Sequence, residues 1–488
     1  MTLELQDPTL LKTQAYIDGQ WLDGDSGESF QVLNPATGET IAEVASCGAA
    51  ETRRAIEAAE AAQKHWRTLP AKERSTVLRR WYELIMANQE DLARLMTAEQ
   101  GKILAESRAE IAYAASFIEW FAEEAKRVYG DVIPLPQSDR RGVAIRQPVG
   151  VCAAITPWNF PAAMITRKAG PALAVGCAMV LKPAKETPLS ALALAELADR
   201  AELPAGLLSV VVGRSSAAIG GELTSNPVVR KLTFTGSTPV GKTLTEQCAA
   251  TMKRTSMELG GNAPVIVFED ADLDAAVAGA AASKYRNSGQ TCICANRILV
   301  QDSVYDAFVE KLTALVGSFK VGNGMDAAVT HGPVVNTQAV ADIDALVQDA
   351  LAKGATATVG GAPSDLGPCY YDMTVLTDVN TGMRVHQEEI FGPVAPVFRF
   401  STEQEAIDLA NDTEFGLASY LYTRDIGRVW RVSEGIEYGM VGVNEVAITS
   451  EVIPFGGVKE SGQGREGSKY GCDDYLETKY ICMGGLDD

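Results

Sequence analysis

The sequence is short of the residue types that mark several common protein classes. It has only three histidines, His65, His331 and His386, which lie far apart with no second ligand at helical or turn spacing. We therefore expect no metal site. Lys and Arg number 43 against 63 Asp and Glu, so the formal net charge is −20. This charge argues against a nucleic-acid partner or an anionic-membrane surface, because both require clustered cations.

Long apolar segments and dense cysteines are also missing. The longest apolar stretch, Pro171 to Leu181, is much shorter than the ~20 residues that span a bilayer. The N-terminal sequence MTLELQDPTLLKTQ has no basic segment followed by an apolar run, so it does not resemble a secretory signal. Nine scattered cysteines do not make a disulfide scaffold. We expect a soluble, cytoplasmic protein with free thiols.

What is present indicates a large α/β protein of about three structural units. Apolar residues at three- and four-residue spacing predict amphipathic helices over 49–68 and 71–100. From Val149 onward, helical stretches separate the short apolar runs VGVCAAIT, CAMVLKP, LSVVVG, VRKLTFTG and PVIVF. Strands that alternate with helices predict parallel βαβ units, and near-continuous apolar strands predict a sheet covered on both faces. This pattern is typical of a doubly wound nucleotide-binding domain.

A second α/β region follows the first. Its pattern predicts helices at 272–287, 303–317 and 338–353 and strands at 296–301 and 395–400. The tail after Pro454 is rich in glycine and charge, and it ends in YLETKYICMGG, an alternating segment that predicts a strand. A terminal strand on its own is only marginally stable, which favours pairing with a partner subunit.

The segment GSTPVGKT, residues 236–243, satisfies the pattern of a phosphate-binding loop and follows a predicted strand. The run VIVFED supplies an acidic residue after another strand, so an ATP-hydrolysing enzyme is an alternative. Pro239 argues against it, because it removes a backbone N–H where such a loop needs donors. A glycine turn that brings a helix N-terminus to a dinucleotide pyrophosphate fits better. A turn without a ligand also remains open.

Three residues are candidates for catalysis. Cys292 lies in the polar segment RNSGQTCICANR, where a thiol can be accessible, although an isolated cysteine is more often a packing residue. Glu258, in MELGGNAP, ends an apolar stretch, where partial burial would raise its pKa toward that of a useful base. Asn159, in TPWNFP, follows a predicted strand at the edge where open α/β sheets bind ligands. Its amide could donate to an oxyanion, or it could simply stabilise the turn.

Taken together, these segments closely resemble the aldehyde dehydrogenase superfamily. The matching motifs are TPWNFP, LKPAKETPLSAL, FTGSTPVG, MELGGNAP, GQTCICANR, EEIFGPV and PFGGVKESGQGRE, and the resemblance begins at YIDGQW near Tyr16. It implies two doubly wound parallel-sheet domains and a β oligomerisation arm. The implied dinucleotide-binding domain spans 1–132 and 145–257, and the catalytic domain spans 258–457. The arm and C-terminal tail cover 133–144 and 458–488, which implies a homodimer or homotetramer.

The resemblance also assigns catalytic roles. Cys292 would attack the aldehyde carbonyl, and Asn159 together with the backbone N–H of Cys292 would hold the resulting oxyanion. Glu258 would activate the water that hydrolyses the thioester.

The same resemblance places a nicotinamide dinucleotide over residues from five segments. These residues are Thr156, Trp158, Asn159, Lys182, Pro183, Ala184, Lys185, Gly236, Ser237, Leu259, Glu389 and Phe391. Relatives that prefer NAD commonly have a glutamate at the position of Lys185. A lysine there attracts a 2′-phosphate, so we expect a preference for NADP, with dual use of NADP and NAD as the alternative.

Within the superfamily, the blocks SKYRNSGQTCICAN, NFPAAMITRKAGPALA and GREGSKYG resemble the succinate-semialdehyde dehydrogenase branch. The resemblance implies that Arg167 and Arg286 bind the distal carboxylate, that Thr449 or Ser450 supplies a hydroxyl, and that Phe455 lies at the substrate site. Glutarate semialdehyde or a broader range of aldehydes remains an alternative, because one methylene changes binding little. Cys294, two residues after Cys292, could form a reversible disulfide with it.

Overall fold

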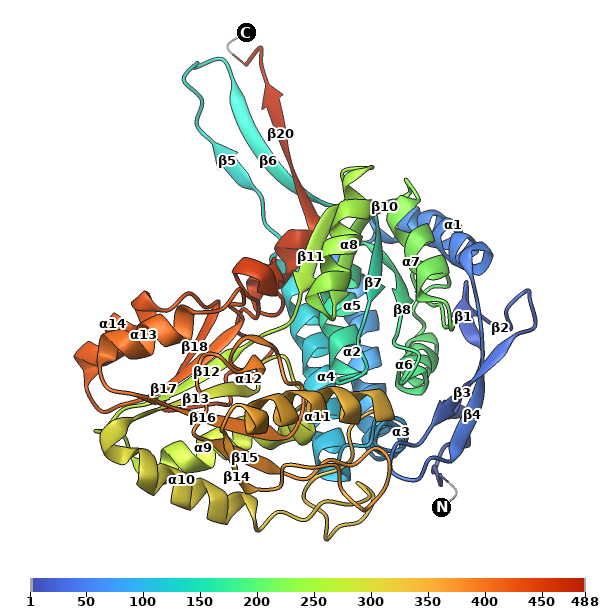
Figure 1. The fold of residues 1–488 in the computed structure, drawn as a ribbon. Helices are drawn as coiled ribbons and strands as arrows, with labels where there is room; N and C mark the ends of the chain where they lie inside the picture. The colour runs from blue at the N-terminus through green and yellow to red at the C-terminus, as the bar shows by residue number, and fades with distance from the viewer. Residues whose placement is uncertain (1–2, 487–488) are drawn as a thin grey trace.

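The computed structural model describes residues 3–486 and contains two α/β bodies and a projecting β arm (Figure 1). The first body holds an eight-stranded sheet, the second a seven-stranded sheet, and the arm three strands. This is the predicted architecture. Within residues 3–486, no helix is both long and apolar enough to cross a membrane.

The first sheet has five parallel strands at its centre. Its order is β19-β11-β10-β7-β8-β9-β1-β2. The parallel strands are β7 (Val151–Ile155), β8 (Ala178–Lys182), β9 (Leu208–Val210), β10 (Val229–Thr235) and β11 (Arg254–Glu258). The edges depart from the predicted parallel arrangement, because β1 (Ala15–Ile17), β2 (Gln20–Leu22) and β19 (Gly462–Gln463) pair antiparallel. β19 brings part of the C-terminal tail into this sheet.

Eight helices accompany the first sheet. They are α1 (Ala49–Trp66), α2 (Ala71–Ala87), α3 (Gln89–Gln100), α4 (Leu104–Glu124), α5 (Ala163–Val175), α6 (Pro188–Arg200), α7 (Ser216–Ser225) and α8 (Thr238–Ala249). The prediction of one helix over 71–100 was wrong, because the chain breaks at Asn88, with φ −109° and ψ 18°. The Asn88 amide donates to the Leu84 carbonyl at 2.8 Å, a local bond that competes with continued helix.

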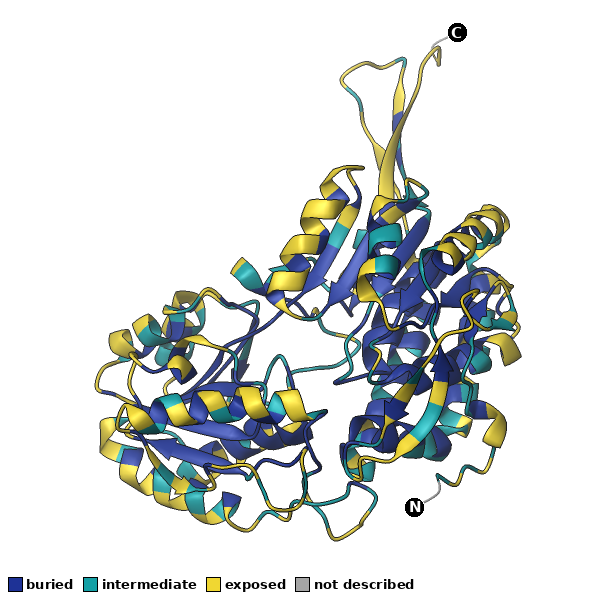
Figure 2. Cartoon of the chain, turned by 45° about the vertical axis from the view of Figure 1, so that its right-hand side comes forward, coloured by how far each residue is buried: buried dark blue, intermediate teal, exposed yellow. Residues whose placement is uncertain are grey.

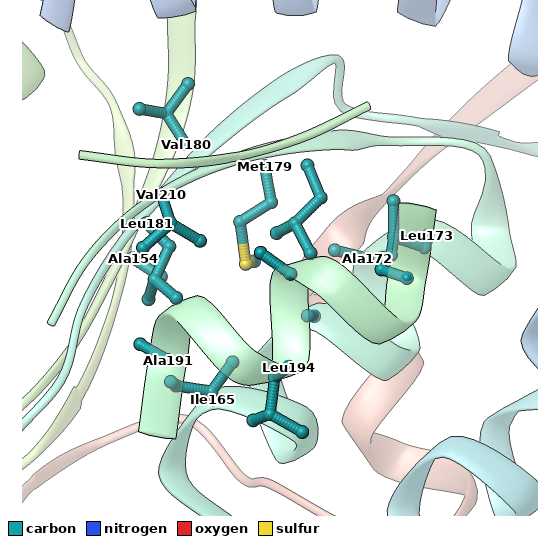
Figure 3. Close-up of a cluster of buried hydrophobic side chains, with 14 of the residues drawn as sticks. Ala154, Ile165, Ala172, Leu173, Met179, Val180, Leu181, Ala191, Leu194 and Val210 are labelled. Atoms are coloured by element: carbon teal, nitrogen blue, oxygen red, sulfur yellow. The ribbon is translucent and has the colours of Figure 1, made fainter. Parts of the chain in front are cut away.

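The core of this body lies between strands and helices (Figure 3). Small and branched side chains of β7, β8 and β9 meet those of α5 and α6, and all of them are fully or almost fully buried. They include Ala154, Met179, Leu181, Val210, Ile165, Ala172, Leu173, Ala191 and Leu194. This packing makes the carboxyl ends of the parallel strands a rigid platform for the loops that follow them.

The second sheet has the order β14-β15-β16-β13-β12-β17-β18. Its strands are β12 (Ala263–Val267), β13 (Ala295–Gln301), β14 (Thr356–Val359), β15 (Thr374–Thr377), β16 (Val394–Phe400), β17 (Ala418–Tyr422) and β18 (Met440–Val443). Only β14, at the edge, pairs antiparallel. The helices are α9 (Leu273–Tyr285), α10 (Asp302–Val316), α11 (Thr337–Ala352), α12 (Arg384–Gln387), α13 (Glu403–Asn411) and α14 (Ile426–Gly435). The three predicted helices and two predicted strands agree to within about two residues, the usual uncertainty of element ends.

The arm consists of β5 (Asp131–Ile133), β6 (Arg141–Pro148) and β20 (Leu476–Met483), and it projects from the body as a largely exposed ribbon (Figures 1 and 2). The expectation that the final strand is unpaired within its own chain was wrong. β20 pairs antiparallel with β6 along its whole length, from Leu476 opposite Pro148 to Met483 opposite Arg141. A separate hairpin joins β3 (Ser29–Leu33) to β4 (Thr40–Ala45).

Five short 3-10 helices complete the described chain, at Pro8–Leu10, Ala125–Arg127, Arg286–Gly289, Lys459–Ser461 and Lys469–Tyr475.

Candidate active site

A cavity of about 230 Å³, here called the reaction cavity, opens where loops of the two bodies meet. Asn159 comes from the loop after β7, Glu258 ends β11, and Cys292 lies in the turn before β13. The carboxyl ends of parallel strands meet at one edge of a sheet, which explains why distant segments converge here. The lining residues are Pro157, Trp158, Asn159, Met164, Thr235, Gly236, Ser237, Glu258, Leu259, Gly260, Cys292, Glu389 and Phe391. The three predicted catalytic residues therefore line one cavity.

Cys292 differs from most of the other cysteines in its exposure. Of the nine cysteines, only Cys292 and Cys482 are not buried. Desolvation of the half-buried thiol, followed by the nearby carboxyls of Glu389 and Glu258, raises the pKa of Cys292 to about 12. The thiol is therefore protonated at neutral pH and needs a base to become a nucleophile. The backbone here tolerates no side chain at Gly261, where a Cβ would lie 2.3 Å from the Cys292 carbonyl oxygen.

Glu258 has the surroundings of a base. Both of its carboxyl oxygens are buried, and neither has a hydrogen-bond partner within residues 3–486. Burial, reinforced by the Glu466 carboxyl, raises the pKa of Glu258 well above its usual value, although Arg167 and Lys168 oppose the shift. A carboxylate that is poorly solvated and unpaired accepts a proton readily.

Asn159 is held at both its side chain and its backbone. Its Oδ1 accepts from Phe160 N at 3.1 Å, and its Nδ2 donates to Gln290 O at 3.1 Å. An amide nitrogen carries two hydrogens, so one remains for a ligand in the cavity. The Asn159 carbonyl accepts from Lys102 Nζ at 2.7 Å and from Asn287 Nδ2 at 3.1 Å.

The residues predicted for the cofactor fall into two groups. Trp158, Asn159, Gly236, Ser237, Leu259, Glu389 and Phe391 line the reaction cavity. Glu389 accepts from Gly261 N at 2.9 Å, and burial raises its pKa to about 7. The rings of Trp158 and Phe391 meet edge to face at 5.5 Å. These contacts fix one end of the predicted cofactor site.

The second group lies at the ends of β7 and β8, outside the lining of the cavity, and consists of Thr156, Lys182, Pro183, Ala184 and Lys185. Thr156 N donates to Lys182 O at 3.1 Å, so the two strand ends are adjacent. The buried Thr156 hydroxyl has no hydrogen-bond partner. Burial lowers the pKa of Lys182 to about 8. Lys185 is exposed, with its Nζ 3.8 Å from Glu186 Oε1.

The geometry of residues 236–243 does not favour the ATP-hydrolysing alternative. The exposed Lys242 ammonium pairs with Glu460 at 2.6 Å, and the Thr243 hydroxyl donates to the Pro239 carbonyl at 3.1 Å. Neither side chain is held toward a shared phosphate position. Among residues 3–486, no three His, Cys, Asp or Glu side chains are grouped so that they could hold a metal ion.

The residues predicted for the substrate are less closely gathered. Arg167 is fully buried, with Nε 2.8 Å from Glu466 Oε2 and its guanidinium 4.1 Å from the centre of the Phe455 ring. Its Nη1 contacts the sulfur of Met164, which lines the cavity, and its Nη2 has no hydrogen-bond partner in the described part of the chain. Arg286 is exposed and lies 5.1 Å from the centre of the Phe160 ring.

The two predicted hydroxyl residues, Thr449 and Ser450, are half-buried and do not line the cavity. Ser450 donates to Glu451 at 2.9 Å.

Cys294 is buried, and its sulfur contacts groups other than Cys292. Its thiol donates to Gly289 O at 3.2 Å, and Lys284 Nζ lies 3.8 Å from its sulfur. Both cysteines of the C-x-C segment are free thiols in this structure. The proposed disulfide with Cys292 remains a prediction.

Comparison with known proteins places this arrangement in a family. The sequence profile of the aldehyde dehydrogenase family matches residues 21–481. The chain belongs to this family. As a member, it is an aldehyde dehydrogenase enzyme that acts on small aldehydes, and the family uses NAD or NADP.

Several curated proteins align with this chain over almost its whole length and over their own. A glutarate-semialdehyde dehydrogenase of Pseudomonas aeruginosa is 62% identical over 484 residues, which is 99% of this chain and 100% of that protein. A 3-sulfolactaldehyde dehydrogenase of Pseudomonas putida is 61% identical, and an NADP-dependent succinate-semialdehyde dehydrogenase of Escherichia coli is 60% identical, with the same coverage. A crystal structure of an E. coli NADP-dependent enzyme superposes with a TM-score of 0.98 at 60% identity, over 99% of this chain and 100% of that one.

Sequence reasoning missed several residues that hold the site in place. Lys102, Glu110, Asn287 and Gln290 contact the Asn159 loop, and Lys168 and Glu466 form a buried ion pair near Glu258. None of them stands in a spacing that marks chemistry. Lys102 follows a glycine at a helix end, a place where an exposed lysine is common.

Proposed function

We propose that the chain oxidises succinate semialdehyde, or a closely related short aldehyde with a distal anionic group, to the acid, with NADP as the preferred acceptor. The single observation that carries the substrate proposal is the buried Arg167, whose Nη2 has no partner and whose Nη1 contacts Met164 in the wall of the cavity. A buried cation with an unused donor favours an anionic ligand.

Catalysis would begin at Cys292. Glu258, through a water or directly, takes the thiol proton, and the sulfur adds to the aldehyde carbon to give a thiohemiacetal. The oxygen becomes an anion that Asn159 Nδ2 and the Cys292 backbone N–H stabilise by about 3 kcal/mol each. A bound nicotinamide supplies the hydride acceptor. The residues that would hold it fit this task, since Glu389 is anchored and aromatic rings face the cavity.

The second half of the reaction is hydrolysis of the Cys292 thioester. Glu258, after releasing the thiol proton to solvent, would take a proton from water as the oxygen adds to the thioester carbon, and Asn159 would again hold the oxyanion. Collapse breaks the carbon–sulfur bond and releases the carboxylic acid, and Glu258 gives the proton to the leaving sulfur to restore the thiol. One carboxyl can serve both steps because its two oxygens have no fixed partner that would compete for the proton.

The preference for NADP rests on Lys185. Its exposed ammonium lies 3.8 Å from Glu186, and the Thr156 hydroxyl, buried at the adjacent strand end, has no hydrogen-bond partner among residues 3–486. Both are suited to the ribose end of a dinucleotide, and a cation favours a 2′-phosphate there.

The names of the three relatives support an anionic aldehyde. Each names an aldehyde that carries a carboxylate or a sulfonate at the end of the molecule opposite the aldehyde. Glutarate semialdehyde is the second candidate, because the relative at 62% identity is named for it.

The test is a comparison of initial rates with succinate semialdehyde, glutarate semialdehyde, 3-sulfolactaldehyde and uncharged butanal, each with NADP and with NAD. We expect kcat/KM for succinate semialdehyde to exceed that for butanal by about 10–100-fold, the usual effect of one charged hydrogen bond. Equal values for the two would contradict the anion site. A kcat/KM for glutarate semialdehyde above that for succinate semialdehyde would make glutarate semialdehyde the preferred substrate. Faster turnover with NAD would contradict the role of Lys185.

We also propose that the arm joins copies of the chain into a dimer or tetramer. Val132, Tyr480, Ile481 and Met483 on the arm are exposed apolar residues, and their burial between copies would remove them from water. Light scattering of the purified protein should give a mass of two or four chains, whereas a single-chain mass would contradict the proposal.

A further inference from the structure

A buried ion pair lies against the Asn159 loop without lining the reaction cavity. Lys102 Nζ lies 2.6 Å from Glu110 Oε2 and 2.7 Å from the Asn159 carbonyl oxygen. The exposed fractions of the two side chains are 0% and 1%. The ammonium also lies 4.1 Å from the centre of the Phe160 ring. A lysine has three donors, so two are used by oxygen atoms and the third faces an aromatic ring.

Glu110 extends this contact to the start of α5. Its Oε1 accepts from Ala162 N at 3.0 Å and from Ala163 N at 3.2 Å, at a helix start that has no side-chain cap of its own. A carboxylate at a helix N-terminus satisfies the free N–H groups there. The pair therefore joins α4, the Asn159 loop and α5, the helix that carries Arg167.

A second tie connects the same carbonyl to the segment before Cys292. Asn287 Nδ2 donates to Asn159 O at 3.1 Å, and Asn159 Nδ2 donates to Gln290 O at 3.1 Å. Asn287 N donates in turn to Glu106 Oε1 on α4 at 2.8 Å. The loops that carry the oxyanion donor and the nucleophile thus share anchors on one helix.

The backbone beside Lys102 has little room to move. A Cβ on Gly332 would lie 2.1 Å from the Gly101 carbonyl oxygen, and a Cβ on Gly324 would lie 2.5 Å from the Lys102 carbonyl oxygen. Chain from the second body therefore packs tightly against residues 101 and 102. Because the backbone of Lys102 is held in place, its ammonium can fix the position of the Asn159 carbonyl that it binds.

We propose that Lys102, paired with Glu110, is the positioning residue for Asn159, and that it sets the place of the oxyanion donor by holding the Asn159 backbone carbonyl. Lys102 does not touch the substrate. A displacement of about 1 Å at a reacting group can cost about 100-fold in rate, so loss of this anchor has a measurable effect. The inference rests on aldehyde oxidation at Cys292 and does not depend on which aldehyde is preferred.

The experiment uses the full-length Lys102→Met and Lys102→Met/Glu110→Gln variants. The single variant leaves a buried carboxylate without its cation, whereas the double variant removes both charges and keeps an oxygen for the start of α5. We expect kcat/KM of the double variant to fall by about 10–100-fold. Alkylation of Cys292 by iodoacetamide should change by less than about twofold, because it does not need the oxyanion donor.

The deciding comparison repeats the double substitution in an Asn159→Ala background. If Lys102 acts through the Asn159 amide, the double substitution should lower kcat/KM almost no further in the Asn159→Ala background, because the oxyanion donor is already gone. Ile85→Ala in α2, fully buried and remote from the cavity, is the control for lost stability. It should lower the melting temperature and leave kcat/KM unchanged. Should the double variant melt below the assay temperature, the kinetics of every protein are measured at a lower temperature at which the double variant is folded.

Two results would overturn the inference: a double variant within about twofold of wild-type kcat/KM, or an equal fold-loss in the wild-type and Asn159→Ala backgrounds. The assay uses an aldehyde that the wild-type protein oxidises. Failure of the succinate proposal would appear as a wild-type enzyme inactive on succinate semialdehyde, so the two failures are distinguishable.

Discussion

The two ends of the predicted dinucleotide site differ sharply in their surroundings. At the reaction cavity, Glu258 and Arg167 are buried and have polar atoms without partners, and Asn159 is held by several hydrogen bonds. At the other end, Lys185 is exposed and its ammonium lies 3.8 Å from Glu186. Buried groups act in a weakly screened environment, whereas salt and water weaken an exposed charge. Substitutions at the cavity should therefore change rates by orders of magnitude. Substitutions at Lys185 should change the preference for NADP over NAD by a smaller factor.

The largest effect should come from Cys292→Ala. Without a nucleophile, kcat should fall by about 10⁴-fold or more, because the remaining residues only bind and polarise the aldehyde. Formation of the reduced cofactor, followed by absorbance, measures this. Cys482→Ala, the other cysteine that is not buried, is the matched control and should keep full activity. Substantial turnover by Cys292→Ala would mean that another group carries the chemistry.

Glu258→Gln should have the next largest effect, a loss of about 10²–10⁴-fold in steady-state turnover. Burial raises the pKa of Glu258, and only its deprotonated form is a base. The wild-type rate should therefore rise with pH through a limb that lies above the usual glutamate range, and the variant should lack that limb. Rates measured across pH with both proteins test this. An unchanged pH profile would assign the limb to another group.

These cavity residues also show what sequence alone could and could not provide. The sheets could be predicted because their strands are near-continuous apolar runs, and Cys292, Glu258 and Asn159 could be predicted because each stands in a distinctive motif. The break at Asn88 could not, because a single side-chain bond to Leu84 ends an otherwise regular helical pattern. The pairing of β20 with β6 joins segments more than 300 residues apart in the sequence, so no local pattern contained it.

The same limit applies to the anchors of the site. Lys102 and Glu110 are eight residues apart, yet they meet at an Asn159 loop that lies 57 residues from Lys102 in the chain. Glu466 reaches Lys168 across 298 residues. Such contacts depend on the folded packing of several elements, and a charged residue in a sequence is far more often exposed.

The two predicted substrate arginines extend the comparison between buried and exposed groups. Arg167→Met should raise KM for succinate semialdehyde and lower kcat/KM by about 10–100-fold, with little effect on butanal, because it removes a buried charged donor. Arg286→Met should change kcat/KM less, since Arg286 is exposed and its charge is screened. Kinetics with both aldehydes measure the two effects. A larger effect of Arg286→Met would reverse the expected importance of the two residues.

The smallest expected effect is at Lys185. Lys185→Glu should lower the NADP/NAD ratio of kcat/KM by about 2–10-fold, the size expected for an exposed charge pair, and added salt should reduce the difference. Lys64→Glu, an exposed lysine on α1, makes the same charge change elsewhere and should leave the ratio unaltered. A ratio that does not respond to Lys185→Glu would place the basis of cofactor preference in other residues.

The most direct test of the central claim is to trap the covalent intermediate. Glu258→Gln, incubated with NADP and succinate semialdehyde until one equivalent of reduced cofactor has formed and then quenched in acid, should carry one succinyl group per active site, because the thioester that forms slowly without the base is hydrolysed more slowly still. Peptide mass spectrometry should locate the group on Cys292. A protein that forms the reduced cofactor but carries no acyl group, or carries it on another cysteine, would contradict catalysis through Cys292.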